Sequence, residues 1–145
     1  MLRKDAKIEL LKRIPLFAQC SKKELGSIAQ ITEERRIESG AVLIDEGEPG
    51  HEIYVVVEGL LEMSRRGSGA FATSGPGELV GEMALFSDKP RSATVTAATP
   101  VRLLRIGDGD FLALVDRLPH LWLKLAASLA DRVPDDERID AHYRD

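Results

Sequence analysis

The chain of 145 residues has a single cysteine, no long apolar run and no excess of positive charge. Cys20 has no second cysteine with which to form an internal disulfide, and no cysteine cluster indicates a metal site. A free thiol favours a reducing compartment. No apolar run approaches the roughly 18 residues of a membrane-spanning helix. The formal net charge of −4 argues against a general nucleic-acid-binding surface.

The N-terminus also lacks the apolar core of a signal peptide, because residues 1–5 read M-L-R-K-D. We therefore expect a cytoplasmic protein, or the cytoplasmic part of a larger one. The chain length suits one domain with a proper core and is too short for two ordinary domains. A content of 43% hydrophobic and 30% charged residues is typical of a soluble globular protein.

Signatures of catalysis and metal binding are also missing. The histidines at 51, 120 and 142 are scattered and form no H-x-H pair, which disfavours a metal-binding cupin. No serine or cysteine nucleophile has a histidine at a recognisable spacing. The sequence therefore predicts a protein that is not an enzyme and has no cofactor.

Residues 1–32 have the pattern of two helices. Ile8 and Leu11 share one face of a helix at residues 6–13, which Pro15 ends. Ser21 with Glu24 three residues later is the pattern of a capping box, and it predicts the start of a second helix. The apolar stripe of that helix comprises Leu25, Ile28, Ala29 and Ile31.

From residue 33 to residue 106 the pattern changes to short β-rich segments separated by glycine turns. The expected strands cover residues 41–44, 53–57, 60–64, 70–73, 93–97 and 101–106. Their spacing of about ten residues favours an antiparallel sandwich or barrel. The glycines at 40, 47, 50 and 59 are interpreted as turn residues, since a positive φ is the ordinary reason for glycine in a turn.

Residues 108–133 predict two further helices. Asp110 is a candidate cap for the first, and Pro119 opens the second, which Pro134 ends at Val133. Trp122 is interpreted as a core anchor rather than an exposed stacking platform. Residues 134–145 form a charged tail.

Residues 77–95 combine groups suited to an anionic sugar ligand. Gly81 opens a short apolar turn at residues 83–86, and the start of a helical turn offers free backbone N–H groups. Arg91 supplies a planar fork of donors for a phosphate. Glu82 can accept hydrogen bonds from sugar hydroxyls. The stretch therefore predicts a pocket for a ligand with one anionic group and one ribose.

This stretch resembles the phosphate-binding cassette of cyclic nucleotide-binding domains, whose pattern is roughly F-G-E-[LM]-A-[LI] followed by P-R-[STA]-A. The letters here are V-G-E-M-A-L at residues 80–85 and P-R-S-A at residues 90–93, so Val80 replaces the usual aromatic residue. The resemblance covers residues 10–133. It implies that Glu82 binds the ribose 2′-hydroxyl and that Arg91 binds the cyclic phosphate. The implied ligand-binding set is Gly81, Glu82, Met83, Ala84, Arg91, Ser92 and Ala93.

The resemblance implies a mainly β fold with flanking helices, a double-stranded β-helix or jelly-roll barrel with helices at both ends. Residues 1–133 would be the cyclic nucleotide-binding domain, with helices at 1–32, the barrel at 33–106 and helices at 108–133. The implied ligand is cAMP. Family members with serine or alanine at the position of Ser92 favour cAMP, whereas those with threonine often favour cGMP. Binding of cGMP stays open. Leu125, Leu129 and Val133 are lid candidates for the base, with ordinary packing on the barrel an equal alternative.

Sensing without chemistry is the predicted function, with an effector domain or protein that the sequence does not name. A homodimer through the C-terminal helix stays open. Two alternatives also stay open: a truncated transcription regulator without its DNA-binding domain, and a degenerate barrel that binds protein and no nucleotide. The chain itself is expected to bind no nucleic acid.

Overall fold

The computed structural model describes residues 2–81 and 89–132. The predicted helical turn at 83–86, Val133 and the tail at 134–145 lie outside these residues. The described elements are, in order, α1 (Lys4–Lys12), η1 (Pro15–Phe17), α2 (Lys22–Gln30), β1 (Thr32–Ile37), β2 (Val42–Ile44), β3 (Glu52–Glu58), β4 (Leu61–Arg65), β5 (Gly69–Ser74), β6 (Leu79–Val80), β7 (Thr94–Ala97), β8 (Val101–Gly107), α3 (Asp108–Arg117) and α4 (Pro119–Arg132).

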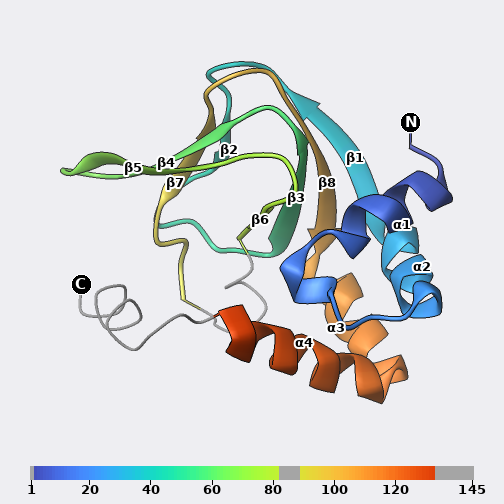
Figure 1. Cartoon of the computed structure of the whole chain (residues 1–145). Helices are drawn as coiled ribbons and strands as arrows, with labels where there is room; N and C mark the ends of the chain where they lie inside the picture. Colours follow the sequence, from blue (N-terminus) through green and yellow to red (C-terminus); the bar gives the residue numbers. More distant parts are fainter. Residues whose placement is uncertain (1, 82–88, 133–145) are drawn as a thin grey trace.

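The strands form two four-stranded sheets, one with the order β1-β8-β3-β6 and the other with the order β2-β7-β4-β5. All their pairings are antiparallel. Figure 1 shows the helices together on one side of the molecule, next to β1 and β8, while β4, β5 and β7 lie on the opposite side. The mainly β class with flanking helices is therefore confirmed.

The sheet β1-β8-β3-β6 is covered on both faces. Ile53 and Val55 of β3 pack in a cluster with the helices, whereas Tyr54 and Val56 pack in a second cluster with the other sheet. A strand buried on both faces reads as a continuous apolar run, which is the pattern I-Y-V-V-V of residues 53–57. The helix-side cluster also includes Leu11, Phe17, Ile28, Leu104, Ile106, Phe111, Leu121 and Leu125.

The N-terminal helices form as the sequence predicts. The Oγ of Ser21 accepts a hydrogen bond from the backbone N–H of Glu24 at 3.1 Å, and the Glu24 carboxylate accepts one from the backbone N–H of Ser21 at 2.8 Å. This reciprocal pair confirms the capping box. Ile8 and Leu11 are buried, as their shared helical face requires.

The sequence patterns do not predict two of the strands, β1 and β6. β1 reads T-E-E-R-R-I and lacks clear alternation, yet it pairs with β8 along its whole length. β6 comprises only Leu79 and Val80. Both depend on a partner strand distant in the sequence, so local propensity does not reveal them.

The expected roles of two C-terminal residues are wrong. Gly107 is the N-cap of α3, so Asp110 lies within the first turn, where a carboxylate favours the positive end of the helix dipole. Trp122 is 38% exposed and is no core anchor, because Leu121 and Leu125 occupy the buried face of α4.

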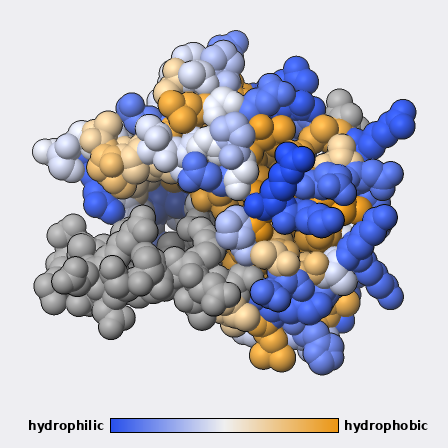
Figure 2. Space-filling view, in the orientation of Figure 1, coloured by the Kyte–Doolittle hydropathy of each residue, from blue (hydrophilic) through white to orange (hydrophobic). Residues whose placement is uncertain are grey.

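Figure 2 shows hydrophilic residues over much of the face in view, with hydrophobic residues between them.

Candidate functional site

Arg91 brings together two segments that are distant in the sequence. Its Nη1 donates a hydrogen bond to the carbonyl oxygen of Gly81 at 3.2 Å, and its Nη2 donates one to the carbonyl oxygen of Glu52 at 2.6 Å. Both acceptors are neutral carbonyl groups, so these bonds fix the direction of the guanidinium fork without cancelling its charge. The arginine is half-buried.

Two glycines enclose the guanidinium. A Cβ atom on Gly50 would lie 2.6 Å from Arg91 Nε, and a Cβ atom on Gly81 would lie 2.7 Å from Arg91 Nη1. Gly81 also has φ of +83°, a backbone conformation that residues with a side chain rarely adopt. Gly50 has no positive φ, unlike Gly40, Gly47 and Gly59. Its interpretation as a turn glycine is therefore wrong, since the reason for glycine at 50 is the close approach of Arg91.

The backbone of Arg91 is also hydrogen-bonded, through both its N–H and its carbonyl oxygen. The N–H of Gly47 donates to the carbonyl oxygen of Arg91 at 2.9 Å, and the N–H of Arg91 donates to the carbonyl oxygen of Glu48 at 2.9 Å. Gly47 has φ of +89°, which allows this turn to face Arg91. The loop between β2 and β3 therefore supports both ends of the residue that carries the charge.

Arg91 lines a hollow of about 250 Å³ between β2, β3 and this loop. The volume is below the roughly 300–1,000 Å³ of a typical pocket for a drug-sized ligand, so these walls suit only part of a nucleotide. The lining residues are Leu43, Ile44, Asp45, Glu48, Pro49, His51, Glu52, Tyr54 and Arg91. The Glu52 carboxylate is paired with Arg105, and His51 lies 3.3 Å from Asp108.

Tyr54 is one of the residues that line this hollow. The residue is only 4% exposed. Burial, followed by the charge and a hydrogen bond of Glu52, raises the pKa of Tyr54 above its ordinary value of 10.0. The phenol therefore stays protonated at neutral pH and can donate a hydrogen bond.

The structure brings part of the predicted site together. Gly81 and Arg91 are in direct contact. Ser92 is exposed and Ala93 is half-buried, and both precede β7. Glu82, Met83 and Ala84 lie outside the described residues, so the predicted ribose contact stays a prediction.

The lid candidates lie on α4 or beyond it. Leu125 is fully buried in the helix-side cluster, which confirms its alternative interpretation as a packing residue. The side chain of Leu129 and all of Val133 lie outside the described part of the chain. A lid contributed by these two residues stays a prediction.

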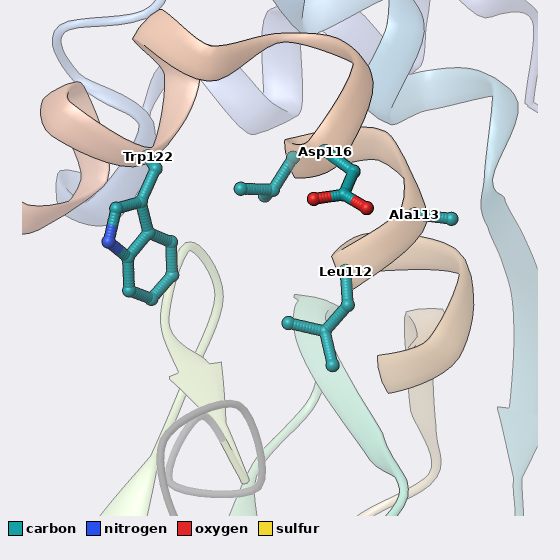
Figure 3. Close-up of a pocket in the computed structure, with 5 residues that line it drawn as sticks. Leu112, Ala113, Asp116 and Trp122 are labelled. Atoms are coloured by element: carbon teal, nitrogen blue, oxygen red, sulfur yellow. The ribbon is translucent and has the colours of Figure 1, made fainter.

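A second hollow, of about 440 Å³, lies between α3 and α4. Figure 3 shows the Trp122 ring on one side and the side chains of Leu112 and Asp116 on the other. Leu112 is 47% exposed. This hollow shares no lining residue with the one beside Arg91.

Other kinds of site find no support in the residues that the structure describes. There, no three or more histidine, cysteine or acidic side chains gather in a way that could hold a metal ion. Within the same ranges, no helix has the length and apolar character needed to cross a membrane.

Comparisons with known proteins identify the family of the chain. The family model described as cyclic nucleotide-binding domain matches residues 34–118. A cyclic nucleotide-gated potassium channel of Mesorhizobium japonicum is 38% identical over 113 residues, which cover 78% of this chain and 31% of the channel. The chain spans 29–31% of the length of the first three curated relatives it matches.

Two solved structures are also similar. The N-terminal domain of a transcriptional regulator from Streptomyces coelicolor has a TM-score of 0.78 and 35% identity, over 86% of this chain and 91% of that one. The regulatory domain of Toxoplasma gondii PKA, solved with cAMP, has a TM-score of 0.72 and 32% identity, over 77% of this chain and 44% of that one. These similarities confirm that the two facing sheets form a jelly roll. The chain therefore belongs to the cyclic nucleotide-binding domain family.

Proposed function

We propose that this chain is a sensor that binds cAMP in preference to cGMP and carries out no chemistry. The observation that carries the proposal is the placement of Arg91, whose guanidinium is enclosed by two glycines and oriented by two carbonyl oxygens beside a hollow. An oriented arginine fork suits a phosphate, which accepts two parallel hydrogen bonds. The similarity to a PKA regulatory domain that was solved with cAMP gives further support.

In this proposal Arg91 binds the cyclic phosphate and Glu82 accepts a hydrogen bond from the ribose 2′-hydroxyl. Backbone N–H groups of Met83, Ala84 and Ser92 complete the phosphate contacts, and Gly81 and Ala93 leave room for the ligand. The preference for cAMP rests on serine at 92, where family members with threonine often favour cGMP. Glu82, Met83 and Ala84 enter only through their match to the family pattern.

Binding would act by shifting a population rather than by driving a reaction. A ligand stabilises the conformation that it binds better, and the proposed change is a repositioning of α3 and α4 over the base. In the structure, an ion pair between Lys124 and Glu24 links α4 to α2. The proposed output is a change in how residues 108–133 contact an effector domain or protein, and a homodimer through α4 is one form of it.

Isothermal titration with cAMP and cGMP in parallel tests the proposal. We expect saturable binding at one site per chain, with the lower dissociation constant for cAMP. Ser92→Thr should narrow the difference between the two dissociation constants, because family members with threonine at this position often favour cGMP. Absence of heat with either nucleotide up to millimolar concentration would instead favour the barrel that binds only protein.

A second candidate is the sensor part of a transcription regulator. The observation that favours it is the 35% identity to the N-terminal domain of the Streptomyces coelicolor regulator, of which this chain covers 91%. The mass of the polypeptide in its native cells, followed by a gel-shift assay with and without cAMP, tests it. A native polypeptide no longer than this chain would contradict this second candidate. A native polypeptide that shifts no DNA in the gel would also contradict it.

A further inference from the structure

The hairpin of β4 and β5 contacts the loop that supports Arg91. The backbone N–H of Arg66 donates to the Glu46 carboxylate at 2.9 Å, and Arg66 Nη2 donates to the Glu46 carbonyl oxygen at 3.1 Å. The two residues thus bind each other reciprocally, side chain to backbone in both directions. Glu46 immediately precedes Gly47, whose N–H donates to the Arg91 carbonyl oxygen.

The same hairpin contacts the chain on the other side of Arg91. Arg65 Nε donates to the carbonyl oxygen of Ser92 at 3.2 Å. The Arg65 guanidinium also lies over the ring of Phe71, with its Cζ 4.5 Å from the ring centroid. A guanidinium stacked on an aromatic ring loses rotational freedom, so its hydrogen bond to Ser92 is held in one direction.

These side chains act where the backbone ladder stops. β4 pairs with β7 from Leu61 and Ala97 to Ser64 and Thr94, and the pairing goes no further toward Arg91. At this last pair the hydroxyl of Thr94 accepts a hydrogen bond from the Glu46 N–H at 3.0 Å. The backbone of residues 91–93 therefore depends on side-chain bonds and on the loop of residues 45–48 for its position.

We propose that Arg65 and Arg66 are positioning residues that hold the Arg91 backbone in place for the phosphate. The proposal rests on the proposed function, since it assumes that Arg91 binds the nucleotide. A binding group must be held within about half an ångström of its productive position by the residues behind it. Holding it there in advance raises affinity, because less freedom is lost when the ligand binds.

Arg65→Ala and Arg66→Ala test this inference, with Arg36→Ala as the matched control. Arg36 is also a strand arginine, 72% exposed at its side chain, and its ion pair with Glu34 is a long 3.7 Å. We expect each hairpin variant to raise the dissociation constant for cAMP about three- to tenfold, as for the loss of one or two exposed hydrogen bonds. Arg36→Ala should bind within twofold of the natural chain.

Amide hydrogen exchange supplies a readout that needs no nucleotide. In Arg66→Ala the N–H groups of Gly47 and Arg91 should exchange about three- to tenfold faster, while the N–H of Leu104 in the core is unchanged. Glu46→Gln keeps an oxygen that can accept from Arg66 and should retain natural exchange rates. Glu46→Ala removes the oxygen that accepts from the Arg66 backbone N–H, whereas Arg66→Ala removes the donor to the Glu46 carbonyl oxygen. Each variant loses one of the two bonds, so exchange should rise by a similar factor in both.

The results separate the two proposals. Faster exchange at Gly47 and Arg91 together with weaker cAMP binding supports the positioning role. Unchanged exchange and unchanged affinity in both arginine variants would overturn it. If the natural chain binds no cyclic nucleotide, the proposed function and the role of the hairpin in affinity both fall, whereas the exchange rates still decide whether the hairpin holds the Arg91 backbone.

Discussion

The helical side of the jelly roll and the region around Arg91 are stabilised in different ways. On the helical side, apolar side chains such as Phe17, Leu104 and Phe111 are almost completely removed from water. Around Arg91, the contacts are hydrogen bonds to backbone carbonyl oxygens and the absence of a Cβ on Gly50 and Gly81. Burial tolerates exchange among apolar residues of similar volume, whereas a cradle of glycines and carbonyl groups tolerates little change.

Phe111→Ala should have the largest effect on stability. The ring is fully buried and lies 6.5 Å from the ring of Phe17, centroid to centroid. Removing it should lower the free energy of unfolding by about 3–5 kcal/mol, because a cavity remains. Phe71→Ala is the control, since that ring is 52% exposed, and it should cost less than about 1 kcal/mol. Urea denaturation of both variants measures the difference, and equal losses would contradict the contrast.

Gly50→Ala should disturb the contacts around Arg91 and weaken cAMP binding, while the packing on the helical side stays unchanged. The added methyl would lie 2.6 Å from Arg91 Nε, so the guanidinium has to move. Loss of its oriented bonds should weaken cAMP binding by about tenfold or more, as expected for charged hydrogen bonds. Titration calorimetry measures the loss.

Gly109→Ala is the matched control for that experiment. Gly109 lies in the first turn of α3, and an added Cβ would have nothing within 4 Å. Alanine is the better helix former, so stability should stay constant or rise by up to about 1 kcal/mol. Natural cAMP affinity in Gly50→Ala would show that the glycine cradle does not serve binding.

Ser21→Ala should have a moderate effect confined to the helical side. It removes the hydroxyl that accepts from the Glu24 N–H at the start of α2. Loss of an N-cap costs about 1 kcal/mol of unfolding free energy, and cAMP affinity should not change. Thermal unfolding together with calorimetry checks both parts. A large loss of affinity would show that the two regions are coupled through α2.

Glu34→Gln should give the smallest effect, a loss of stability near neutral pH that disappears in acid, where Glu34 is protonated in the natural chain. Hydrogen bonding from Arg102, against the opposing effect of burial, lowers the pKa of the Glu34 carboxyl below its ordinary value of 4.5. A lowered pKa in the folded state means that the ionised carboxylate stabilises the fold above about pH 4.5, and that this contribution is lost as the pH falls further. The variant should therefore show a flatter decline of stability below pH 4.5 than the natural chain. Identical acid unfolding curves would contradict this.

The contrast between the two regions also explains what the sequence could predict. The capping box of Ser21 and Glu24 and the apolar faces of α1 and α2 are local patterns, so the sequence alone predicts them. The bond from Arg91 to the Glu52 carbonyl joins residues 39 positions apart, and no local pattern indicates it. The interpretation of Gly50 as a turn residue fails for the same reason, because the atom that requires glycine belongs to another segment.

The assignment of Arg91 itself came from the family pattern at residues 90–93 rather than from periodicity. For Trp122, by contrast, a local pattern gives the wrong prediction. Its place among apolar residues of α4 predicted burial, but a helix buries only one stripe, and Leu121 and Leu125 occupy it.

Comparing the affinities for cAMP and adenosine in the natural chain and in Arg91→Ala tests the central claim most directly. Adenosine has the base and ribose of cAMP but no phosphate, so the ratio of the two affinities isolates the phosphate contact. If the Arg91 guanidinium binds the phosphate, the natural chain should prefer cAMP, and Arg91→Ala should reduce that preference by about tenfold or more. An equal preference in both proteins would contradict the claim that this arginine recognises the phosphate.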